Sequence, residues 1–224
     1  MKVLLTSTSF QDTPGSHKIK LMETGYKIDY MRGPIAEREL LPIIQDYDGV
    51  ICGDDHFSKN VIKAGSKGRL KVLSKYGIGL DKIDLEAAKE FGIIVTNCPG
   101  VNHVTVAEHI IALILMFYKN LFDEISTTRS GKWNRLIGQE LFGKKIGVIG
   151  LGRIGKEVLI RSKAFGLELF AFDKKIDKKF VSDNEVIVTK SIKEIFNKVD
   201  IISLSMDLNK ENKHLLEKHV QSGV

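Results

Sequence analysis

The sequence predicts an α/β fold with parallel sheets in two domains, and three observations lead to this prediction. Short β-branched or apolar runs alternate with helix-like segments along the 224 residues. The alternation breaks once, at Asn97 to Gly100, and a second alternating series opens with a glycine-rich turn at Gly150. Because a parallel strand pair needs a crossover connection, usually a helix, such alternation is typical of parallel sheets.

Five short runs predict the strands of the first domain. They are Val3–Thr6, Tyr26–Tyr30, Val50–Cys52, Lys71–Ser74 and Ile93–Thr96. Helices are predicted after the N-cap residue Ser58, ending at Gly65, and after the N-cap residue Asp84, ending at Gly92 in the left-handed conformation. Residues 1–98 are therefore expected to form one α/β domain.

The break at Asn97 to Gly100 predicts a domain boundary after Cys98. Proline cannot continue a strand ladder, and glycine permits a sharp reversal of the chain. The next segment, Val104 to Asn120, reads as a helix that is apolar nearly all round, so we expect it to be buried against another surface such as a second subunit. Residues 99–224 form the second predicted domain.

A polar stretch that contains the only tryptophan, Trp133, leads into the second alternating series. Strands are predicted at Lys145–Gly150, Glu168–Phe172, Val186–Val188 and Asp200–Leu204, and helices at Ile154–Phe165 and Ser191–Asn197.

The turn between the first strand and helix of this series has the pattern G-x-G-x-x-G. Gly150 permits the tight turn, Gly152 lets the backbone approach a pyrophosphate, and Gly155 allows the helix to pack closely on the strand. The helix N-terminus offers unpaired N–H groups and a positive dipole end to an anion. By itself the pattern is weak evidence, because glycine-rich turns also occur in loops that bind nothing.

An acidic residue strengthens the interpretation. Eighteen residues after Gly155 the next predicted strand ends in Asp173, whose carboxylate can accept hydrogen bonds from ribose hydroxyls. A carboxylate there repels a 2′-phosphate and so favours NAD over NADP, although Lys174 and Lys175 partly offset that repulsion. We predict a dinucleotide site, with NAD as the cofactor.

A second glycine-rich turn, Lys75 to Asp81, follows the predicted strand that ends at Ser74. Its consecutive backbone N–H groups can form an anion-binding nest, with the Lys75 ammonium adding charge for a carboxylate or phosphate. A plain turn without a ligand explains the local sequence equally well.

Composition narrows the function classes. The chain has 34 basic and 28 acidic side chains, and its densest lysine cluster, Lys174 to Lys179, has no interleaved aromatic residues, so we expect no nucleic-acid partner. The longest apolar run, Ile110 to Tyr118, has nine residues, against the roughly 20 that a membrane-spanning helix needs. Cys52 and Cys98 lack neighbours at ligand spacing, which predicts free thiols and no metal site. The apolar stretch at Met1 to Ser7 is too short for a signal peptide, which predicts a cytoplasmic location.

Several segments together carry a family resemblance. Lys75–Asp84, Val95–Asn102 with Val106–Glu108, Gly131–Trp133 and Gly147–Lys156 resemble the D-isomer-specific 2-hydroxyacid dehydrogenases in matching order. The resemblance covers essentially the whole chain, and it is strongest to the branch of D-3-phosphoglycerate dehydrogenases.

This resemblance implies a flavodoxin-like substrate domain and a Rossmann, doubly wound NAD-binding domain, both incomplete in this chain. It also implies a small 2-hydroxy or 2-oxo acid as substrate and a homodimer formed through the apolar helix. The implied substrate-binding residues are Lys75, Gly77, Ile78 and Gly79. The implied cofactor-binding residues are Gly150, Gly152, Arg153, Ile154, Gly155, Asp173, Ser205 and Met206.

Two segments depart from the family pattern. After Ile202 to Leu204 the family has histidine, a variable residue and proline, whereas this chain has Asp207 at the proline position, which predicts a looser loop. The resemblance includes 3-phosphoglycerate among the candidate substrates, but Gly53 to His56 is acidic where the phosphoglycerate enzymes carry a basic residue, which weighs against a phosphorylated substrate.

The resemblance places the catalytic arginine, glutamate and histidine of the family after Val224. We therefore assign no catalytic residue within this chain, and expect either a longer natural polypeptide or a truncated product. Two functions stay open: an NAD-dependent dehydrogenase of D-2-hydroxy acids, or a non-catalytic NAD-binding regulatory module, with an inactive truncated product as a variant of the second.

Overall fold

The computed structural model describes residues 1–209, 212–215 and 217. It consists of two compact units, residues 1–101 and 102–224, which we describe separately. The division therefore falls after Val101, whereas the sequence predicts it after Cys98.

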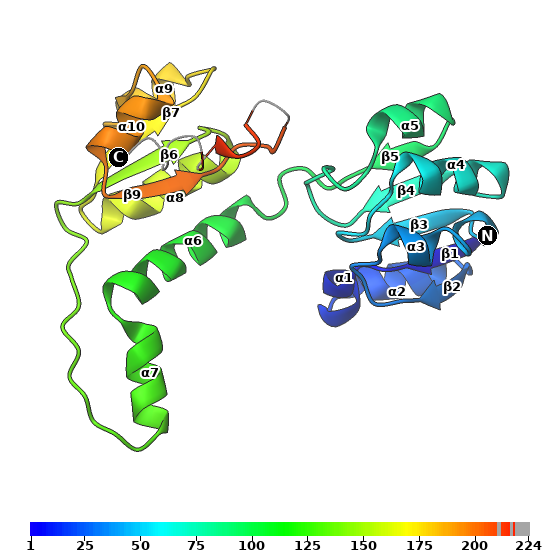
Figure 1. Cartoon of the computed structure of the whole chain (residues 1–224), viewed down its shortest axis with the longest axis horizontal. Helices are drawn as coiled ribbons and strands as arrows, with labels where there is room; N and C mark the ends of the chain where they lie inside the picture. Colours follow the sequence, from blue (N-terminus) through cyan, green and yellow to red (C-terminus); the bar gives the residue numbers. More distant parts are fainter. Residues whose placement is uncertain (210–211, 216, 218–224) are drawn as a thin grey trace. The chain divides into compact units, whose positions relative to one another are not determined.

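The first unit is built on a parallel sheet of five strands (Figure 1). Its strands are β1 (Lys2–Leu5), β2 (Lys27–Tyr30), β3 (Gly49–Cys52), β4 (Val72–Lys75) and β5 (Ile94–Thr96). The order β2-β1-β3-β4-β5 is that of flavodoxin-like folds, so the predicted fold of this unit is confirmed. In this order the chain reverses direction across the sheet between β1 and β3.

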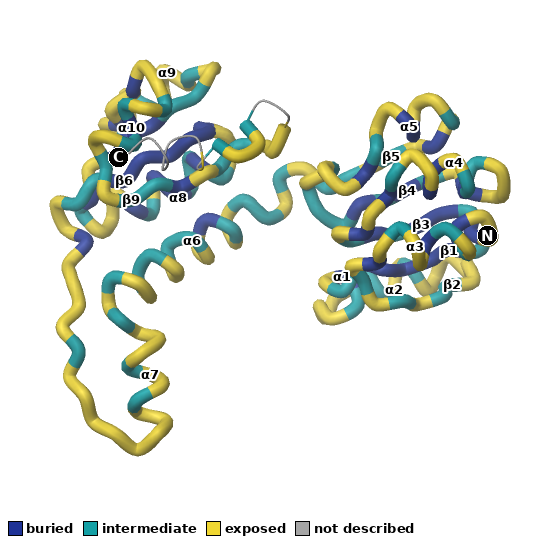
Figure 2. The backbone as a smooth tube through the Cα atoms, viewed as in Figure 1, coloured by how far each residue is buried: buried dark blue, intermediate teal, exposed yellow. Residues whose placement is uncertain are grey.

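Short helices cover the faces of this sheet. They are α1 (Thr8–Asp12), α2 (Ser16–Glu23), α3 (Glu37–Leu40), the 3-10 helix η1 (Ile44–Asp46), α4 (Lys59–Lys67) and α5 (Leu85–Glu90). Leu4, Val50 and Leu73 of the three central strands are fully buried beneath them. Figure 2 shows these strands as largely dark, buried tube.

The predicted helix caps of this unit are confirmed, and one predicted helix end is wrong. Asp84 accepts a hydrogen bond from the Ala87 N–H and begins α5, and Gly92 has a φ of 68°. Ser58 likewise begins α4, but α4 continues through Gly65. A Cβ at Gly65 would lie 2.5 Å from the Leu70 side chain, so this glycine serves close packing inside the helix.

The second unit has a four-stranded parallel sheet with the order β8-β7-β6-β9. Its strands are β6 (Lys145–Ile149), β7 (Glu168–Phe172), β8 (Ile187–Val188) and β9 (Ile201–Leu204). This order matches the first four strands of the doubly wound 3-2-1-4-5-6 arrangement, which confirms the predicted Rossmann fold. The reversal point lies between β6 and β9.

Within the described residues, five helices belong to this unit. They are α6 (His103–Tyr118), α7 (Leu121–Arg129), α8 (Arg153–Ala164), α9 (Lys178–Asn184) and α10 (Ile192–Lys198). The sequence-based interpretation treats the segment before Trp133 as a polar connection, whereas Leu121 to Arg129 forms α7. The Thr127 hydroxyl donates to the backbone carbonyls of Asp123 and Glu124, so its hydrogen bonds are formed within the helix.

The long helix α6 packs on α8 along one face, and Ala107 is fully buried there. Its other face is not buried within the unit, since Phe117 is 76% exposed.

Among the described helices, none is long and apolar enough to cross a membrane alone. The pair α6 and α7 reaches that length and composition only together, across a bend of 68°.

Candidate functional site

The turn between β6 and α8 has a backbone that only glycine allows at two positions. Gly150 has a φ of 101°, and a Cβ there would lie 2.7 to 2.8 Å from the backbone of Ser205 and Met206. A Cβ at Gly155 would lie 2.1 Å from the Gly150 carbonyl oxygen and 2.8 Å from the Val148 side chain. Gly150 therefore shapes the turn, and Gly155 brings α8 close to β6.

Gly152 differs from these two glycines, because a Cβ there would meet no described atom within 4 Å. It is the N-cap residue of the 12-residue helix α8, and no side chain caps the first N–H groups of that helix. The open space and the uncapped N–H groups fit the approach of a pyrophosphate to the helix N-terminus. Arg153 is exposed at the first helical position, whereas Ile154 packs partly onto the apolar core.

Asp173 joins the ends of β6 and β7. One of its carboxylate oxygens accepts a hydrogen bond from the Leu151 N–H at 2.6 Å, and the other accepts from the Lys175 N–H at 2.8 Å. The carboxylate is thereby held beside the glycine turn. Each carboxylate oxygen has two lone pairs, so these two bonds leave capacity for ribose hydroxyls.

A cavity of about 480 Å³ opens beside this carboxylate, at the carboxyl ends of the strands. Its lining includes Gly150, Asp173, Lys174, Ile192, Met206 and Asn212. The cavity therefore lies at the reversal point of the sheet, where doubly wound folds bind their ligands. Such a site suits an adenine dinucleotide: a glycine turn for the phosphates, an acid for a ribose and an apolar wall.

The loop after β9 supplies part of this lining. Ser205 donates its N–H to the Ile149 carbonyl at 2.8 Å, which continues the pairing with β6. The Asn212 side chain donates to the Asp207 carbonyl at 2.6 Å and accepts from the Asn209 N–H at 2.8 Å. These hydrogen bonds connect Asp207, Asn209 and Asn212 among the described residues of the loop.

Sequence reasoning did not single out Ile192, Asn209, Asn212 or Leu215 as lining residues. Asn209 and Asn212 form reciprocal side-chain to backbone bonds, a pattern that their spacing could have suggested. Ile192 carries no such signal, because only the tertiary structure brings the start of α10 to the end of β7.

The second glycine turn, at the end of β4, is fixed by side chains and backbone around it. The Gly77 carbonyl accepts from the Cys98 N–H at 2.8 Å, and the Ile78 carbonyl accepts from the Asn97 side chain at 2.9 Å. Gly77 and Ile78 are half-buried, and Gly79 is exposed. The turn is thus tied to the end of β5 through its carbonyls.

Lys75 is buried below this turn. Its Nζ donates to the Gly53 carbonyl and to the Asp54 carboxylate, each at 2.6 Å. The predicted positive charge is present, and an acidic side chain from the neighbouring loop already contacts it.

The described histidines do not form a buried pair with a carboxylate. His214 lies 2.8 Å from Glu217, but both side chains are more than half exposed, as in an ordinary surface pair. His56 lies 3.9 Å from Glu37, and His17 stacks on Tyr76. His219 lies outside the described residues.

Comparison with known proteins identifies the family. Residues 111–222 match the model described as "D-isomer specific 2-hydroxyacid dehydrogenase, NAD binding domain". The D-3-phosphoglycerate dehydrogenase of Methanocaldococcus jannaschii is 35% identical over 219 residues, which are 96% of this chain and 40% of that protein. The hydroxypyruvate reductase of Thermotoga maritima is 35% identical over 82% of this chain and 59% of its own length.

Solved structures agree with this assignment. The apo-structure of D-lactate dehydrogenase from Escherichia coli superposes with a TM-score of 0.80 at 28% identity, covering 96% of this chain and 68% of that chain. The TT0316 protein from Thermus thermophilus reaches a TM-score of 0.82 at 31% identity, with the same coverage.

This chain spans about 40% of the length of the Methanocaldococcus relative. The matched domain is described as NAD binding, which confirms the predicted cofactor. With the glycine turn, the acid at the end of β7 and the strand orders of both sheets, the matches show that the chain belongs to the D-isomer specific 2-hydroxyacid dehydrogenase family.

Proposed function

We propose that this chain binds NAD and a small D-2-hydroxy acid as part of an enzyme that transfers a hydride between the nicotinamide cofactor and C2 of that acid. The observation that carries the proposal is the cavity at the carboxyl ends of β6 and β7, which places Asp173 beside the glycine turn. NAD, when bound, supplies the hydride acceptor. The names of the relatives, among them D-3-phosphoglycerate dehydrogenase, hydroxypyruvate reductase and glyoxylate reductase, support a 2-hydroxy or 2-oxo acid as substrate.

Each predicted site residue has a defined part in this proposal. The N–H groups at Gly152, Arg153 and Ile154 bind the pyrophosphate, and Asp173 binds the adenosine ribose. Met206 lines the cavity beside Asp173, and with the preceding Ser205 it borders the cofactor. The backbone N–H groups of Ile78 and Gly79, with Lys75 beneath them, bind the substrate carboxylate, whereas the Gly77 N–H donates to the Lys75 carbonyl at 3.0 Å. None of the relatives named above is a non-catalytic binding module.

The proposal assigns no acid/base catalyst among the described residues, because none of their histidines has a buried carboxylate partner. A polypeptide of residues 1–224 should therefore bind NADH without oxidising it when glyoxylate is added. Absorbance at the NADH band measures this, and turnover would show that a residue of this segment supplies the proton.

Calorimetric titration with NADH tests the cofactor site. Asp173→Ala should weaken binding by about 1–3 kcal/mol, the scale of a lost hydrogen bond to a charged group. Asp173→Asn keeps one oxygen that can accept from Leu151, so it separates loss of the ribose contact from loosening of the turn. Equal affinity in all three proteins would exclude Asp173 as the ribose contact.

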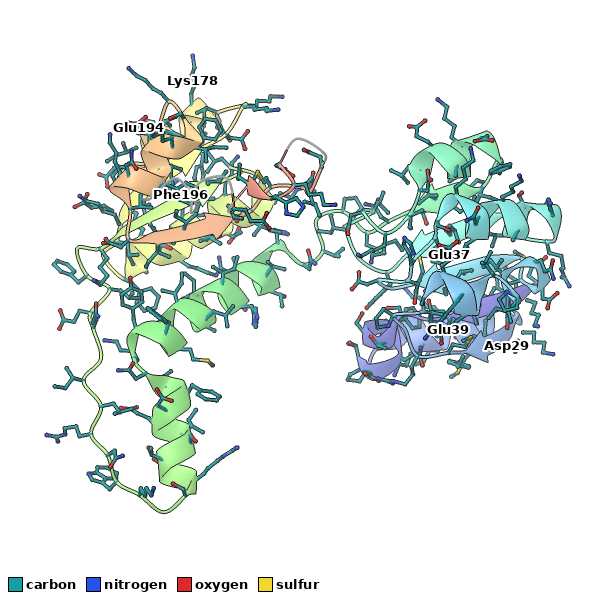
Figure 3. The ribbon with its side chains drawn as sticks, in the orientation of Figure 1. Asp29, Glu37, Glu39, Lys178, Glu194 and Phe196 are labelled. Atoms are coloured by element: carbon teal, nitrogen blue, oxygen red, sulfur yellow. The ribbon has the colours of Figure 1, made fainter. Side chains whose placement is uncertain are left out.

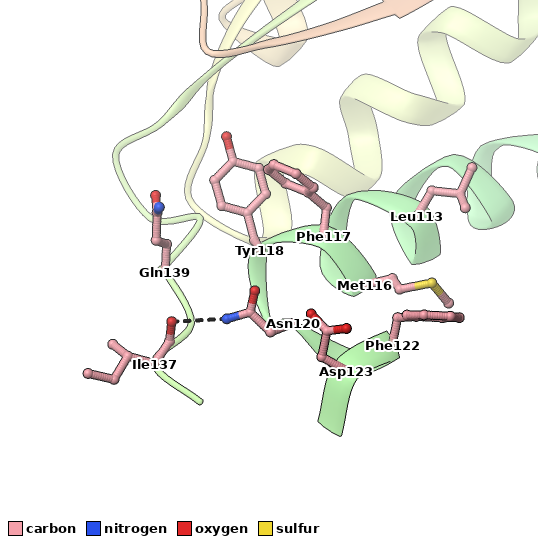
Figure 4. A pocket seen from close by; sticks show the side chains of 9 residues that line it. All are labelled: Leu113, Met116, Phe117, Tyr118, Asn120, Phe122, Asp123, Ile137 and Gln139. Carbon is pink, nitrogen blue, oxygen red and sulfur yellow. Dashed lines mark hydrogen bonds between the residues drawn. The ribbon is translucent and has the colours of Figure 1, made fainter. Parts of the chain in front are cut away.

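We also propose that the chain forms a homodimer through the α6–α7 surface, which we define as Leu113, Met116, Phe117, Phe122 and Ile137. Phe117, Phe122 and Ile137 are 76%, 71% and 91% exposed. The same surface contains a cavity of about 440 Å³ (Figure 4). A surface that carries both protruding rings and a hollow can be self-complementary, as a two-fold interface requires.

The extended segment after α7 belongs to this surface. The Asn120 side chain donates to the Ile137 carbonyl at 3.0 Å (Figure 4). The Gln139 N–H donates to the Tyr118 carbonyl at 2.7 Å. These bonds hold the segment beside the end of α6.

A cytoplasmic location is part of the proposal, and the two free cysteines support it.

A further inference from the structure

The carboxyl edge of the first sheet contains a charged cluster next to its reversal point. The reversal lies between β1 and β3, and ligands of such sheets bind outside the carboxyl ends of the strands at that point. The loop after β3 carries Gly53, Asp54 and Asp55, and Lys75 ends the neighbouring strand β4. The charged side chains of this cluster would therefore interact directly with the charged groups of a bound acid.

The Lys75 ammonium is the cation of the cluster, and its residue is only 5% exposed. A buried ammonium is costly unless it is paired and hydrogen-bonded. Two of its donors are used by the Gly53 carbonyl and the Asp54 carboxylate, each at 2.6 Å. The charge of Lys75 is therefore offset by Asp54 before any ligand arrives.

Asp54 and Asp55 have opposite environments although they are adjacent. Asp55 is fully buried and accepts hydrogen bonds from the Gly53 N–H at 3.0 Å, the Ile35 N–H at 2.8 Å and the Thr6 hydroxyl. Those three donors hold the loop in place. The Asp54 side chain is 80% exposed, so its carboxylate separates the buried ammonium from solvent.

The charges around the turn add up to an acidic excess. Lys75 and the exposed Lys82 contribute two formal positive charges, whereas Asp54, Asp55 and the exposed Asp81 beside Gly79 contribute three formal negative charges. A single carboxylate can still bind the backbone N–H groups of the turn. A second anionic group, such as a phosphate, would meet Asp54 in place of a free cation.

We propose that Asp54 is a specificity-determining residue that restricts the substrate to unphosphorylated 2-hydroxy monocarboxylic acids. The inference rests on the proposed function, since it assigns the turn at Lys75 to Gly79 to the substrate. It narrows that function, because the names of the relatives include both phosphorylated and unphosphorylated substrates.

Two probes with the same carbon skeleton test this role. Hydroxypyruvate and 3-phosphohydroxypyruvate are titrated calorimetrically into the protein with NAD⁺ bound, because NAD⁺ cannot reduce either compound. The variants are Asp54→Asn, which removes the charge, and Asp54→Glu, which keeps it. Glu90→Gln is the matched control, since Glu90 is also an exposed carboxylate paired with a lysine, at 2.7 Å from Lys59.

Asp54→Asn should strengthen binding of the phosphorylated probe about tenfold relative to hydroxypyruvate, the effect of about 1.4 kcal/mol. Asp54→Glu and Glu90→Gln should leave the ratio of the two dissociation constants within about twofold of the parent. An unchanged ratio in Asp54→Asn, with both probes bound, overturns the role of Asp54 alone. Binding of neither probe to any variant overturns the proposed substrate class as well.

Discussion

Single residues decide how the cofactor turn is built. The three glycines of the G-x-G-x-x-G pattern are identical in the sequence, yet a side chain would meet backbone at Gly150 and Gly155 and empty space at Gly152. The first two are therefore required by the fold, whereas Gly152 is free to serve a ligand.

This difference predicts opposite behaviour for two alanine variants. Gly155→Ala should lower the free energy of unfolding by about 1–3 kcal/mol or more, because the new methyl group overlaps the Gly150 carbonyl. Gly152→Ala should leave that free energy nearly unchanged and weaken NADH binding, because its methyl group occupies the approach to the helix N-terminus. Urea unfolding and NADH titration separate the two effects. Loss of stability in both variants would contradict the assignment.

A second prediction at this scale concerns the thiols. Burial raises the pKa of Cys52 to about 12, and the thiolate is the reactive form. The half-buried Cys98 should therefore be alkylated by iodoacetamide at pH 8 well before Cys52 in the folded protein. Mass spectrometry of peptides after timed alkylation measures the order, and faster labelling of Cys52 would refute it.

At the scale of elements, ion pairs form both between neighbouring strands and within single helices. Asp29 in β2 pairs with Lys2 in β1, and Glu194 pairs with Lys198 within α10. Figure 3 labels Asp29 on the first unit and Glu194 on α10, and both side chains are partly buried. Such partly solvated pairs add little individually. Asp48 does more, because it accepts from the Lys2 N–H at 2.6 Å and also pairs with Arg69 before β4.

These contacts of Asp48 predict an acid-labile first unit. The hydrogen bonds from Lys2 and Arg69 hold the pKa of Asp48 below its usual 3.8. The stability that this group contributes is therefore present above that value and is lost as the pH falls through the lower pKa of the folded state. In Asp48→Asn the urea midpoint should depend less on pH between 5 and about 2 than in the parent. An unchanged slope would exclude Asp48 as a contributor.

At the scale of the whole molecule, the main unexplained feature is the exposed α6–α7 surface. Figure 2 shows α7 and the extended segment after it as largely exposed, and Trp133 in that segment is 89% exposed. The sequence predicts that the α6 helix is buried, and within the unit this holds for its face toward α8 only.

Dimerisation through this surface predicts a concentration-dependent mass. Sedimentation should show a dimer in the parent and a monomer in Phe122→Asp, which places a charge in the interface. Ile19→Asp is the control, since Ile19 is 59% exposed on α2, outside the α6–α7 surface. A monomeric parent at high concentration, or a dimer in all three proteins, would contradict this interface.

The sequence by itself determined the order and kind of the strands, the two domains, the glycine turn with Asp173 and the NAD cofactor. These follow from local patterns, because strand periodicity, helix caps and glycine spacing act over a few residues. It misplaced the end of α4 at Gly65, where packing against Leu70 outweighs the tendency of glycine to end a helix.

Only the tertiary structure decided how distant groups meet. It places Asn212 and Ile192 at the cofactor cavity, distinguishes buried Asp55 from exposed Asp54, and sets Asp54 against Lys75. Adjacent acids look alike in a sequence, because burial and pairing depend on contacts between strands far apart in the chain. The net charge beside a substrate at Lys75 therefore depends on how Lys75 and Asp54 pair at the edge of the folded sheet. The residue types alone could not reveal this pairing.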